Sequence, residues 1–251
     1  EPWYTAVDPV IVWDSSVPDV ATVSETGYVR TLSEGSTVIR ATLYRDGRPT
    51  LYSVSATLTV GPEFVVQNGM LTEYHGKGGK VTIPRNLNVY YIYEEAFRDN
   101  TNITELEILA PCMEIQQFAF SNMKALKRIV LPDTIEYVYS YAFYNCPNLE
   151  RIDLHSRSIS FGASCFANCT SLKYINNVQL LNGLKAEDVN ILDLQEGTDY
   201  VRIAPHMTTI GAYCFSNCTA LQDLDLTELR VAGEGAFYSC TGLKKLTLSR
   251  F

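Results

Sequence analysis

The chain has 251 residues, of which 46% are hydrophobic and 19% are charged, and this composition excludes an intrinsically disordered protein. Twenty Lys and Arg residues stand against 28 Asp and Glu residues, giving a net charge of −8 that argues against a nucleic-acid partner. No apolar run reaches the ~18 residues of a membrane helix, so membrane attachment would require an anchor outside this chain. The chain starts at Glu1, and we expect that any targeting peptide has been removed.

Residues 1–61 are expected to form a small β domain. Short runs of alternating or apolar residues occur at 10–13, 20–23, 38–43 and 52–60, separated by turn-like residues such as Asp46-Gly47. This pattern is typical of a β-sandwich. Because about 60 residues are few for such a fold, we expect this domain to be truncated at its front.

Gly61-Pro62 marks the expected start of a second domain, residues 62–251. Within it, Asn68-Gly69 between two alternating runs predicts a β-hairpin, and we expect residues 62–84 to cap one end of the structure that follows. The glycine-rich stretch 75–80 superficially suggests a phosphate-binding loop. It lacks the Gly-Lys-Ser/Thr ending, so we interpret it as a turn after the hairpin.

A repeat dominates the second domain. A small residue followed by Phe recurs at intervals of 23, 23, 23, 49 and 22 residues, with Phe at 97, 120, 143, 166, 215 and 237. Mostly aliphatic residues recur six, nine and eleven positions after each Phe. This spacing predicts a leucine-rich solenoid in which each coil contributes a strand and a short helix-compatible segment. Residues 178–205 break the period and are expected to form an irregular repeat or an insertion. The predicted fold class is therefore mainly β with short helices.

The seven cysteines all fall at positions that the repeat directs inward. Buried free thiols are the favoured interpretation, with disulfides between Cys146 and Cys169 or between Cys218 and Cys240 as the alternative. The pairs at 165/169 and 214/218 have metal-like spacing but no nearby His, so neither a metal nor a cofactor is predicted. The odd cysteine count excludes complete intramolecular pairing.

The second domain resembles the BspA-like leucine-rich repeats of bacterial surface proteins in phrases such as IGAYCFSNCTAL (210–221) and VYSYAFYNCPNL (138–149). The first domain is similar to bacterial Ig-like domains of group 2 in VWDSSVPDVATV (12–23) and in residues 27–29 and 35–41. The resemblance implies an exported protein of the bacterial cell surface that adheres to host matrix proteins, host cells or other bacteria. For the Ig-like part, the resemblance implies a role as a spacer.

Two sets of side chains are candidate binding residues. The first is a mixed-charge ribbon at the outward strand positions, where successive coils align side chains such as Glu105 and Glu107. Its candidate members are Arg128, Arg151, Asp153, Tyr174, Asp223 and Asp225. The second set is a tyrosine cluster in the first coils, since exposed tyrosines favour protein or glycan contacts. Its members are Tyr90, Tyr91, Tyr93, Tyr137, Tyr139, Tyr141 and Tyr144. A solvated sheet face and tyrosines packed between coils are the respective alternatives.

We expect no enzymatic activity. The three histidines, His75, His155 and His206, fall at unrelated positions of the repeat, and every cysteine already has a structural position. Asn168 and Asn217 begin glycosylation sequons but are better interpreted as turn residues. The predicted function is non-catalytic adhesion or ligand binding, with a protein or a glycan as partner. The alternative is a structural scaffold whose partner domain would follow Phe251.

Overall fold

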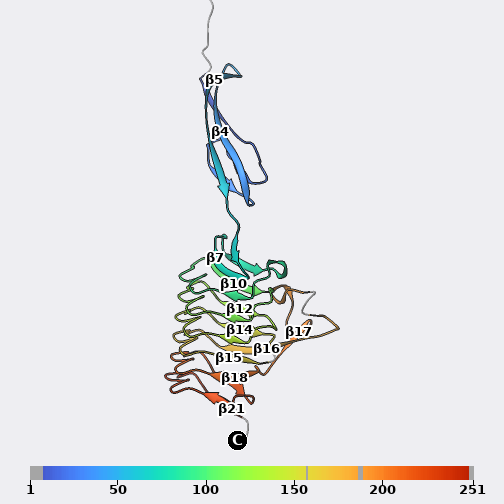
Figure 1. The fold of residues 1–251 in the computed structure, drawn as a ribbon, viewed down its shortest axis with the longest axis vertical. Helices are drawn as coiled ribbons and strands as arrows, with labels where there is room; N and C mark the ends of the chain where they lie inside the picture. The colour runs from blue at the N-terminus through green and yellow to red at the C-terminus, as the bar shows by residue number, and fades with distance from the viewer. Residues whose placement is uncertain (1–7, 157, 186–188, 249–251) are drawn as a thin grey trace, which may run out of the picture. The chain divides into compact units, whose positions relative to one another are not determined.

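The computed structural model describes residues 8–156, 158–185 and 189–248. The chain divides into two compact units, Glu1–Glu63 and Phe64–Phe251 (Figure 1). This division falls within a few residues of Gly61-Pro62. The expectations about the two chain ends concern Glu1 and Phe251, which lie outside the described ranges.

The first unit contains one antiparallel sheet and one hairpin. The sheet has the order β1 (Val10–Ser15), β4 (Gly35–Arg45), β5 (Arg48–Val60), and the hairpin pairs β2 (Ala21–Val23) with β3 (Val29–Thr31). Asp46 and Gly47 join β4 to β5 with φ angles of 52° and 72°. Positive φ at both positions is what a tight two-residue hairpin turn requires, and the sequence supplies residues that tolerate it.

The sheet of the first unit is covered over only part of one face. Val20, Ala21 and Ile39 are buried, and the Trp13 ring lies against Gly27, where no side chain would fit. Farther along the same sheet, Ile11 and Val54 are exposed. Residues 8–60 therefore form a three-stranded sheet that the β2–β3 hairpin covers over part of one face. Among these residues, no second sheet faces it along its whole length.

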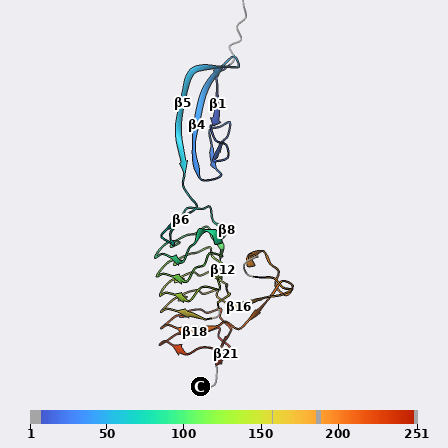
Figure 2. The ribbon, with the colours of Figure 1, turned by 45° about the vertical axis from the view of Figure 1, so that its right-hand side comes forward.

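The second unit is a solenoid built from parallel strands (Figures 1 and 2). One sheet has the order β20 (Val231–Ala232), β18 (Met207–Ile210), β15 (Ile159–Phe161), β13 (Tyr137–Val138), β11 (Glu114–Ile115), β9 (Tyr91–Ile92), β7 (Met70–Tyr74), β6 (Phe64–Gln67). The other has the order β17 (Tyr200–Ile203), β16 (Tyr174–Leu180), β14 (Arg151–Leu154), β12 (Arg128–Leu131), β10 (Ile103–Ile108), β8 (Gly79–Ile83). A final pair joins β19 (Asp223–Leu226) to β21 (Lys245–Leu248).

The predicted hairpin begins the solenoid. Strands β6 and β7 pair antiparallel through the Asn68-Gly69 turn, whose φ angles are 52° and 75°. Strand β7 then pairs in parallel with β9, and β8 pairs in parallel with β10. The hairpin thereby occupies the edge of the eight-stranded sheet and continues into the six-stranded one.

The repeat phenylalanines form a continuous column in the core. Neighbouring rings from Phe97 to Phe237 stack at centroid distances of 5.0, 5.0, 5.3, 5.4 and 5.5 Å. Leucines and isoleucines of the repeat are buried around this column. Each coil alone could not bury its apolar face, so the stacking of coils is the main source of stability.

The prediction of short helices around each Phe is wrong. In the described ranges this segment is a turn, and the helical elements with defined ends are the 3₁₀ turns η1 (Arg85–Leu87) and η3 (Ile191–Asp193). The backbone N–H groups of the first five repeat phenylalanines each donate to a carbonyl of the next coil, as Phe120 does to Ala142 at 2.8 Å. Because these Phe N–H groups donate between coils, they are not available for the i→i−4 bonds of an α-helix, and the internal bonds of the segment are those of turns, such as Ser121 N–H to the Phe118 carbonyl at 3.0 Å.

Asparagines two positions after the repeat Phe also connect coils. The Asn145 side-chain amide donates to Asn122 Oδ1 at 2.7 Å, and Asn217 donates to Asn168 Oδ1 at 2.8 Å. All four have positive φ near 60°, a conformation that Asn tolerates better than most residues. This agrees with the interpretation of Asn168 and Asn217 as turn residues.

All seven cysteines are free; six are buried and Cys240 is partly buried. The thiols of the residues three positions after the repeat Phe each donate to the carbonyl of a Phe in the preceding coil, at 2.9–3.2 Å. Desolvation raises the pKa of Cys165, Cys169 and Cys218 well above the usual value for a thiol. The thiols therefore act as small apolar residues with weak hydrogen bonds.

The described residues 178–185 and 189–205 leave the stack of coils (Figure 2), and part of them packs back against it. The end of β16 pairs antiparallel with β17, and η3 lies between them in the chain. Ile191 and Tyr200 pack with Val130 and Val178 in a small second core. We call the described residues 181–185 and 189–203 the covering segment, because they lie on the outward face of the six-stranded sheet.

Candidate binding surface

The covering segment closes much of the predicted charged ribbon. Glu107, Val130 and Asp153 occupy outward positions of β10, β12 and β14, yet all three are fully buried. The expectation that Asp153 is an exposed ribbon residue is therefore wrong. The repeat pattern correctly directs these side chains away from the Phe column, but it carries no information on what covers them.

The charges beneath the covering segment are paired. Asp153 Oδ2 accepts from Arg128 at 2.6 Å, and the Arg202 guanidinium lies 3.8 Å from Asp153 Oδ1 and 5.4 Å from the centre of the Tyr174 ring. Burial works against the Arg128 charge, but Asp153 outweighs it and raises the pKa of Arg128. Three of the candidate ribbon residues, Arg128, Asp153 and Tyr174, thus hold the covering segment in place.

Glu107 forms the most buried polar contact of the covering segment. Its carboxylate accepts from the backbone N–H groups of Ile191 at 2.6 Å and Leu192 at 3.3 Å. Burial raises the pKa of Glu107, and the two backbone bonds oppose that shift. The Lys80 to Asp193 ion pair and the bond from Arg85 to the Val189 carbonyl, at 3.2 Å, add contacts at the same end.

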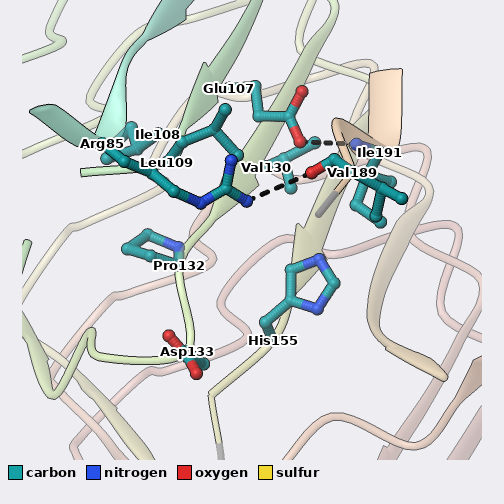
Figure 3. Close-up of a pocket in the computed structure, with 10 residues that line it drawn as sticks. All are labelled: Arg85, Glu107, Ile108, Leu109, Val130, Pro132, Asp133, His155, Val189 and Ile191. Carbon is teal, nitrogen blue, oxygen red and sulfur yellow. Dashed lines mark hydrogen bonds between the residues drawn. The ribbon is translucent and has the colours of Figure 1, made fainter. Parts of the chain in front are cut away.

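A cavity of about 130 Å³ lies between the covering segment and the coils (Figure 3). Ile108, Val130, Pro132 and Ile191 form much of its wall, and the His155 ring points toward Val189 and Ile191. Desolvation lowers the pKa of His155, so the imidazole is neutral at pH 7. Sequence reasoning missed Arg85 and His155 here, because only the return of the distant covering segment brings them into one cavity.

The tyrosine cluster divides into two groups. Tyr141 stacks on Phe118 at 5.1 Å and contacts Tyr144 at 5.8 Å, so both tyrosines belong to the turns of the repeat. The second group lies on the outward face of the eight-stranded sheet; its members are Tyr91, Tyr93, Tyr137 and Tyr139. Tyr90 is partly exposed and packs close to Gly69 of the hairpin.

We call the second group, together with Glu114, the tyrosine face. Tyr93 and Tyr137 are 46% and 37% exposed, which separates them from the buried positions that alternate with them. The Tyr137 and Tyr139 rings lie 4.5 Å apart at a tilt of 60°. Beside them is a groove of about 670 Å³ that runs to three serines of the next coil, Ser156, Ser158 and Ser160.

Tyr93 and Tyr139 occupy the repeat position held by glycine in later coils. A Cβ added to Gly162 or Gly211 would lie 2.5 Å from backbone atoms of the preceding coil, and one on Gly233 would lie closer still. The later coils therefore require glycine, whereas the early coils admit a tyrosine that projects outward. The aromatic side chains are thus a feature of the early coils and not of the repeat.

The remaining ribbon residues, Arg151, Asp223 and Asp225, lie on strands β14 and β19 and not on the eight-stranded sheet. Asp223 and Asp225 are in register with Lys245 and Thr247 of the neighbouring strand, and Asp225 Oδ1 accepts from the Thr227 N–H at 3.1 Å. Arg151 is partly buried on β14. These residues are not close enough to the tyrosine face to form one site with it.

The described residues do not form a metal-binding cluster. No group of three or more His, Cys, Asp and Glu side chains among them is placed to hold a metal ion. His75 pairs with Glu73 at 2.8 Å and His206 lies 3.8 Å from Glu228, while the cysteine thiols line the core. Desolvation raises the pKa of Cys165, Cys169 and Cys218, which disfavours the nucleophilic thiolate form of these three side chains.

Parallel strands stacked coil upon coil, with inward leucines and isoleucines, define a leucine-rich repeat solenoid. The chain belongs to the BspA type leucine rich repeat family, whose model matches residues 80–188 and 193–250 in six copies. Proteins built on this repeat are typically non-enzymatic binding proteins. Among the described residues no helix is long and apolar enough to cross a membrane.

A solved structure shows the same fold, and two others share local similarity with the chain. A leucine-rich repeat protein of T. pallidum is 24% identical, with 71% of this chain and 73% of that chain covered and a TM-score of 0.56. A leucine-rich repeat protein from Bacteroides ovatus is 22% identical, covering 66% and 60% of the two chains, with a TM-score of 0.34. The pneumococcal vaccine antigen PcpA is 17% identical, covering 64% of this chain and 34% of its own, with a TM-score of 0.42. No curated protein matches the chain.

Proposed function

We propose that this chain is a non-catalytic binding protein, exported to the bacterial cell surface, that engages other proteins through the tyrosine face. The observation that carries this proposal is the contrast between the two sheets. The outward face of the eight-stranded sheet presents tyrosines beside a groove, whereas the covering segment occupies the corresponding face of the six-stranded sheet. Tyrosine supplies a large contact area at low conformational cost, which suits it to protein interfaces.

The test is a binding screen of the full chain against immobilised matrix proteins, bacterial surface proteins and glycans. A double variant, Tyr137→Ser with Tyr139→Gly, should lose binding while keeping its fold, because the next coil carries Ser160 and Gly162 at these positions. Tyr28→Ser is the matched control, because Tyr28 is an exposed tyrosine that belongs to the first unit and not to the tyrosine face. Unchanged binding by the double variant, binding to glycans alone, or no binding at high micromolar concentration would each contradict the proposal.

We further infer that the first unit is part of an Ig-like β module that acts as a spacer. The antiparallel order β1-β4-β5, with the β2–β3 hairpin over part of one face, supports this inference. The test is a structure of the chain with its natural upstream sequence. Strands that complete a second sheet over Ile11 and Val54 are expected, and a face that stays bare would count against the module.

Export is tested in the source bacterium. The chain should be cleaved by protease added to intact cells, while a cytoplasmic control protein survives. Survival of the chain under conditions that digest a known surface protein would argue against surface display.

A further inference from the structure

Glu114 lies between two tyrosines on the tyrosine face. Parallel pairing places it in register with Tyr91 of β9 on one side and with Tyr137 of β13 on the other. Side chains at such positions share one face of the sheet, about 4.8 Å from strand to strand. The Tyr139 hydroxyl hydrogen-bonds to the Glu114 carboxylate. Desolvation, and after it the charge and hydrogen bond of Glu114, raise the pKa of Tyr139. Three phenol rings therefore surround one carboxylate.

The charge of Glu114 is not neutralised by a neighbouring cation. Gln116 donates an amide N–H to Glu114 Oε2 at 3.2 Å, and the Tyr139 hydroxyl is also a neutral partner. Within ranges 8–156, 158–185 and 189–248, no ion pair to Glu114 is formed. The described lining of the adjacent groove adds Asp133 and Glu136 but neither Lys nor Arg.

This combination of groups favours a cation. A carboxylate attracts positive charge directly, and the faces of aromatic rings attract it through their quadrupole. An anionic group at the same place would meet repulsion from three carboxylates. A side chain that is apolar along its length and charged at its tip fits best, because its stem can lie against the rings while its tip reaches Glu114.

The groove extends the site beyond a single side chain. It runs from Glu114 past Tyr137 and Tyr139 to Ser156, Ser158 and Ser160, and its volume of about 670 Å³ is in the range that holds a short peptide. The hydroxyls of Ser158 and Ser160 can donate to, or accept from, the backbone of an extended segment, whereas the buried Ser156 hydroxyl already donates to the Ile135 and Ser158 carbonyls. The carboxylates of Glu114, Asp133 and Glu136 and the hydroxyls of the groove thus match a protein chain that carries positive side chains.

We propose that the tyrosine face binds an extended, Lys- or Arg-bearing segment of a partner protein, with one cationic side chain seated at Glu114 among Tyr91, Tyr137 and Tyr139. This inference rests on the proposed function and names the chemistry of its partner. The proposed partner is a cationic protein segment, and binding of neutral or anionic peptides is an alternative outcome of the test.

The test uses the full chain and fluorescently labelled peptides with five Gly-Lys or five Gly-Arg repeats, compared with matched Gly-Gln and Gly-Glu repeats. The cationic peptides should bind roughly tenfold more tightly than the Gly-Gln peptide, the size expected for one cation held by rings and a carboxylate. Their affinity should fall as salt is raised from about 0.05 to about 0.5 M. Equal binding of the Gly-Gln peptide, or tighter binding of the Gly-Glu peptide, would overturn the cation site.

Two variants locate the interaction. Glu114→Gln keeps the size and an acceptor oxygen but removes the charge, and should reduce the affinity for the cationic peptides roughly tenfold. Tyr137→Leu keeps apolar area but removes the ring, and should weaken the same peptides. The control is Glu150→Gln at an exposed acidic position next to β14 of the other sheet, which should leave affinity unchanged.

The outcomes separate this inference from the proposed function. If Glu114→Gln binds cationic peptides as the unchanged chain does, the cation site is wrong, even where Tyr137→Leu still loses protein partners and the proposed function stands. If neither peptides nor the protein panel bind the unchanged chain, both fail. Thermal unfolding of each variant near that of the unchanged chain shows that the loss is not a loss of fold.

Discussion

Glu107 accepts a hydrogen bond from the backbone N–H of Ile191 at 2.6 Å, across 84 residues of sequence. The Glu107 side chain is fully buried, so this contact exists only because the covering segment returns to the six-stranded sheet. It joins a regular coil of the repeat to the segment that interrupts the repeat. The consequence is that one face of the solenoid is closed and the tyrosine face is the open one.

Replacing Glu107 with Ala should loosen the covering segment without unfolding the solenoid. The change leaves the N–H groups of Ile191 and Leu192 without their acceptor, at a cost of about 1–3 kcal/mol. Hydrogen exchange should accelerate at these two amides while the amides of β12 and β14 change little. Unchanged exchange at Ile191 and Leu192 would show that Glu107 does not hold the segment.

The covering segment should also lose stability as pH rises. Burial raises the pKa of Glu107 above its ordinary value of 4.5, so the folded state binds the proton more tightly than the unfolded state. This contribution is fully present below about pH 4.5 and declines as pH rises through the raised pKa. Exchange at Ile191 and Leu192, corrected for its intrinsic pH dependence, should show the decline in the unchanged chain and a flatter profile in Glu107→Gln. Equal slopes in the two proteins would contradict this assignment.

Substitution of glycine and of tyrosine at the same repeat position should differ in its cost to stability. Gly211→Ala places a Cβ 2.5 Å from the backbone of the preceding coil and should destabilise the chain by about 1–3 kcal/mol. Tyr139→Gly removes an outward side chain and should cost about 1 kcal/mol or less, mainly through backbone entropy. Urea unfolding monitored by tyrosine fluorescence compares the two. A tolerated Gly211→Ala would mean that the coils can separate more readily than their packing indicates.

The thiols should be unreactive in the folded chain. Desolvation raises the pKa of Cys112 to about 12, and Cys165, Cys169 and Cys218 are also shifted upward. A thiol reagent at pH 8 should therefore titrate at most Cys240 rapidly, and all seven cysteines after denaturation. Rapid reaction of several thiols in the folded chain would indicate that the coils open on that timescale.

Much of the fold follows from local spacing. The interval of about 23 residues between phenylalanines predicted the stacked coils, and Asn68-Gly69 predicted the hairpin that begins them. The prediction of helices around each Phe failed because the Phe N–H groups bond to the next coil, and such bonds leave no periodic trace within one coil. Tyr137 and Tyr141, four residues apart, likewise fall on different surfaces because a turn lies between them.

The sequence by itself determined which side chains face the core, because a repeat in register reports the inward and outward positions of every coil. It also placed Tyr93 and Tyr139 where later coils need glycine. Only the tertiary structure decided which outward face is open. The contacts of Glu107 with Ile191 and of Asp153 with Arg202 join residues far apart in the chain, and no spacing rule predicts the return path of an irregular segment.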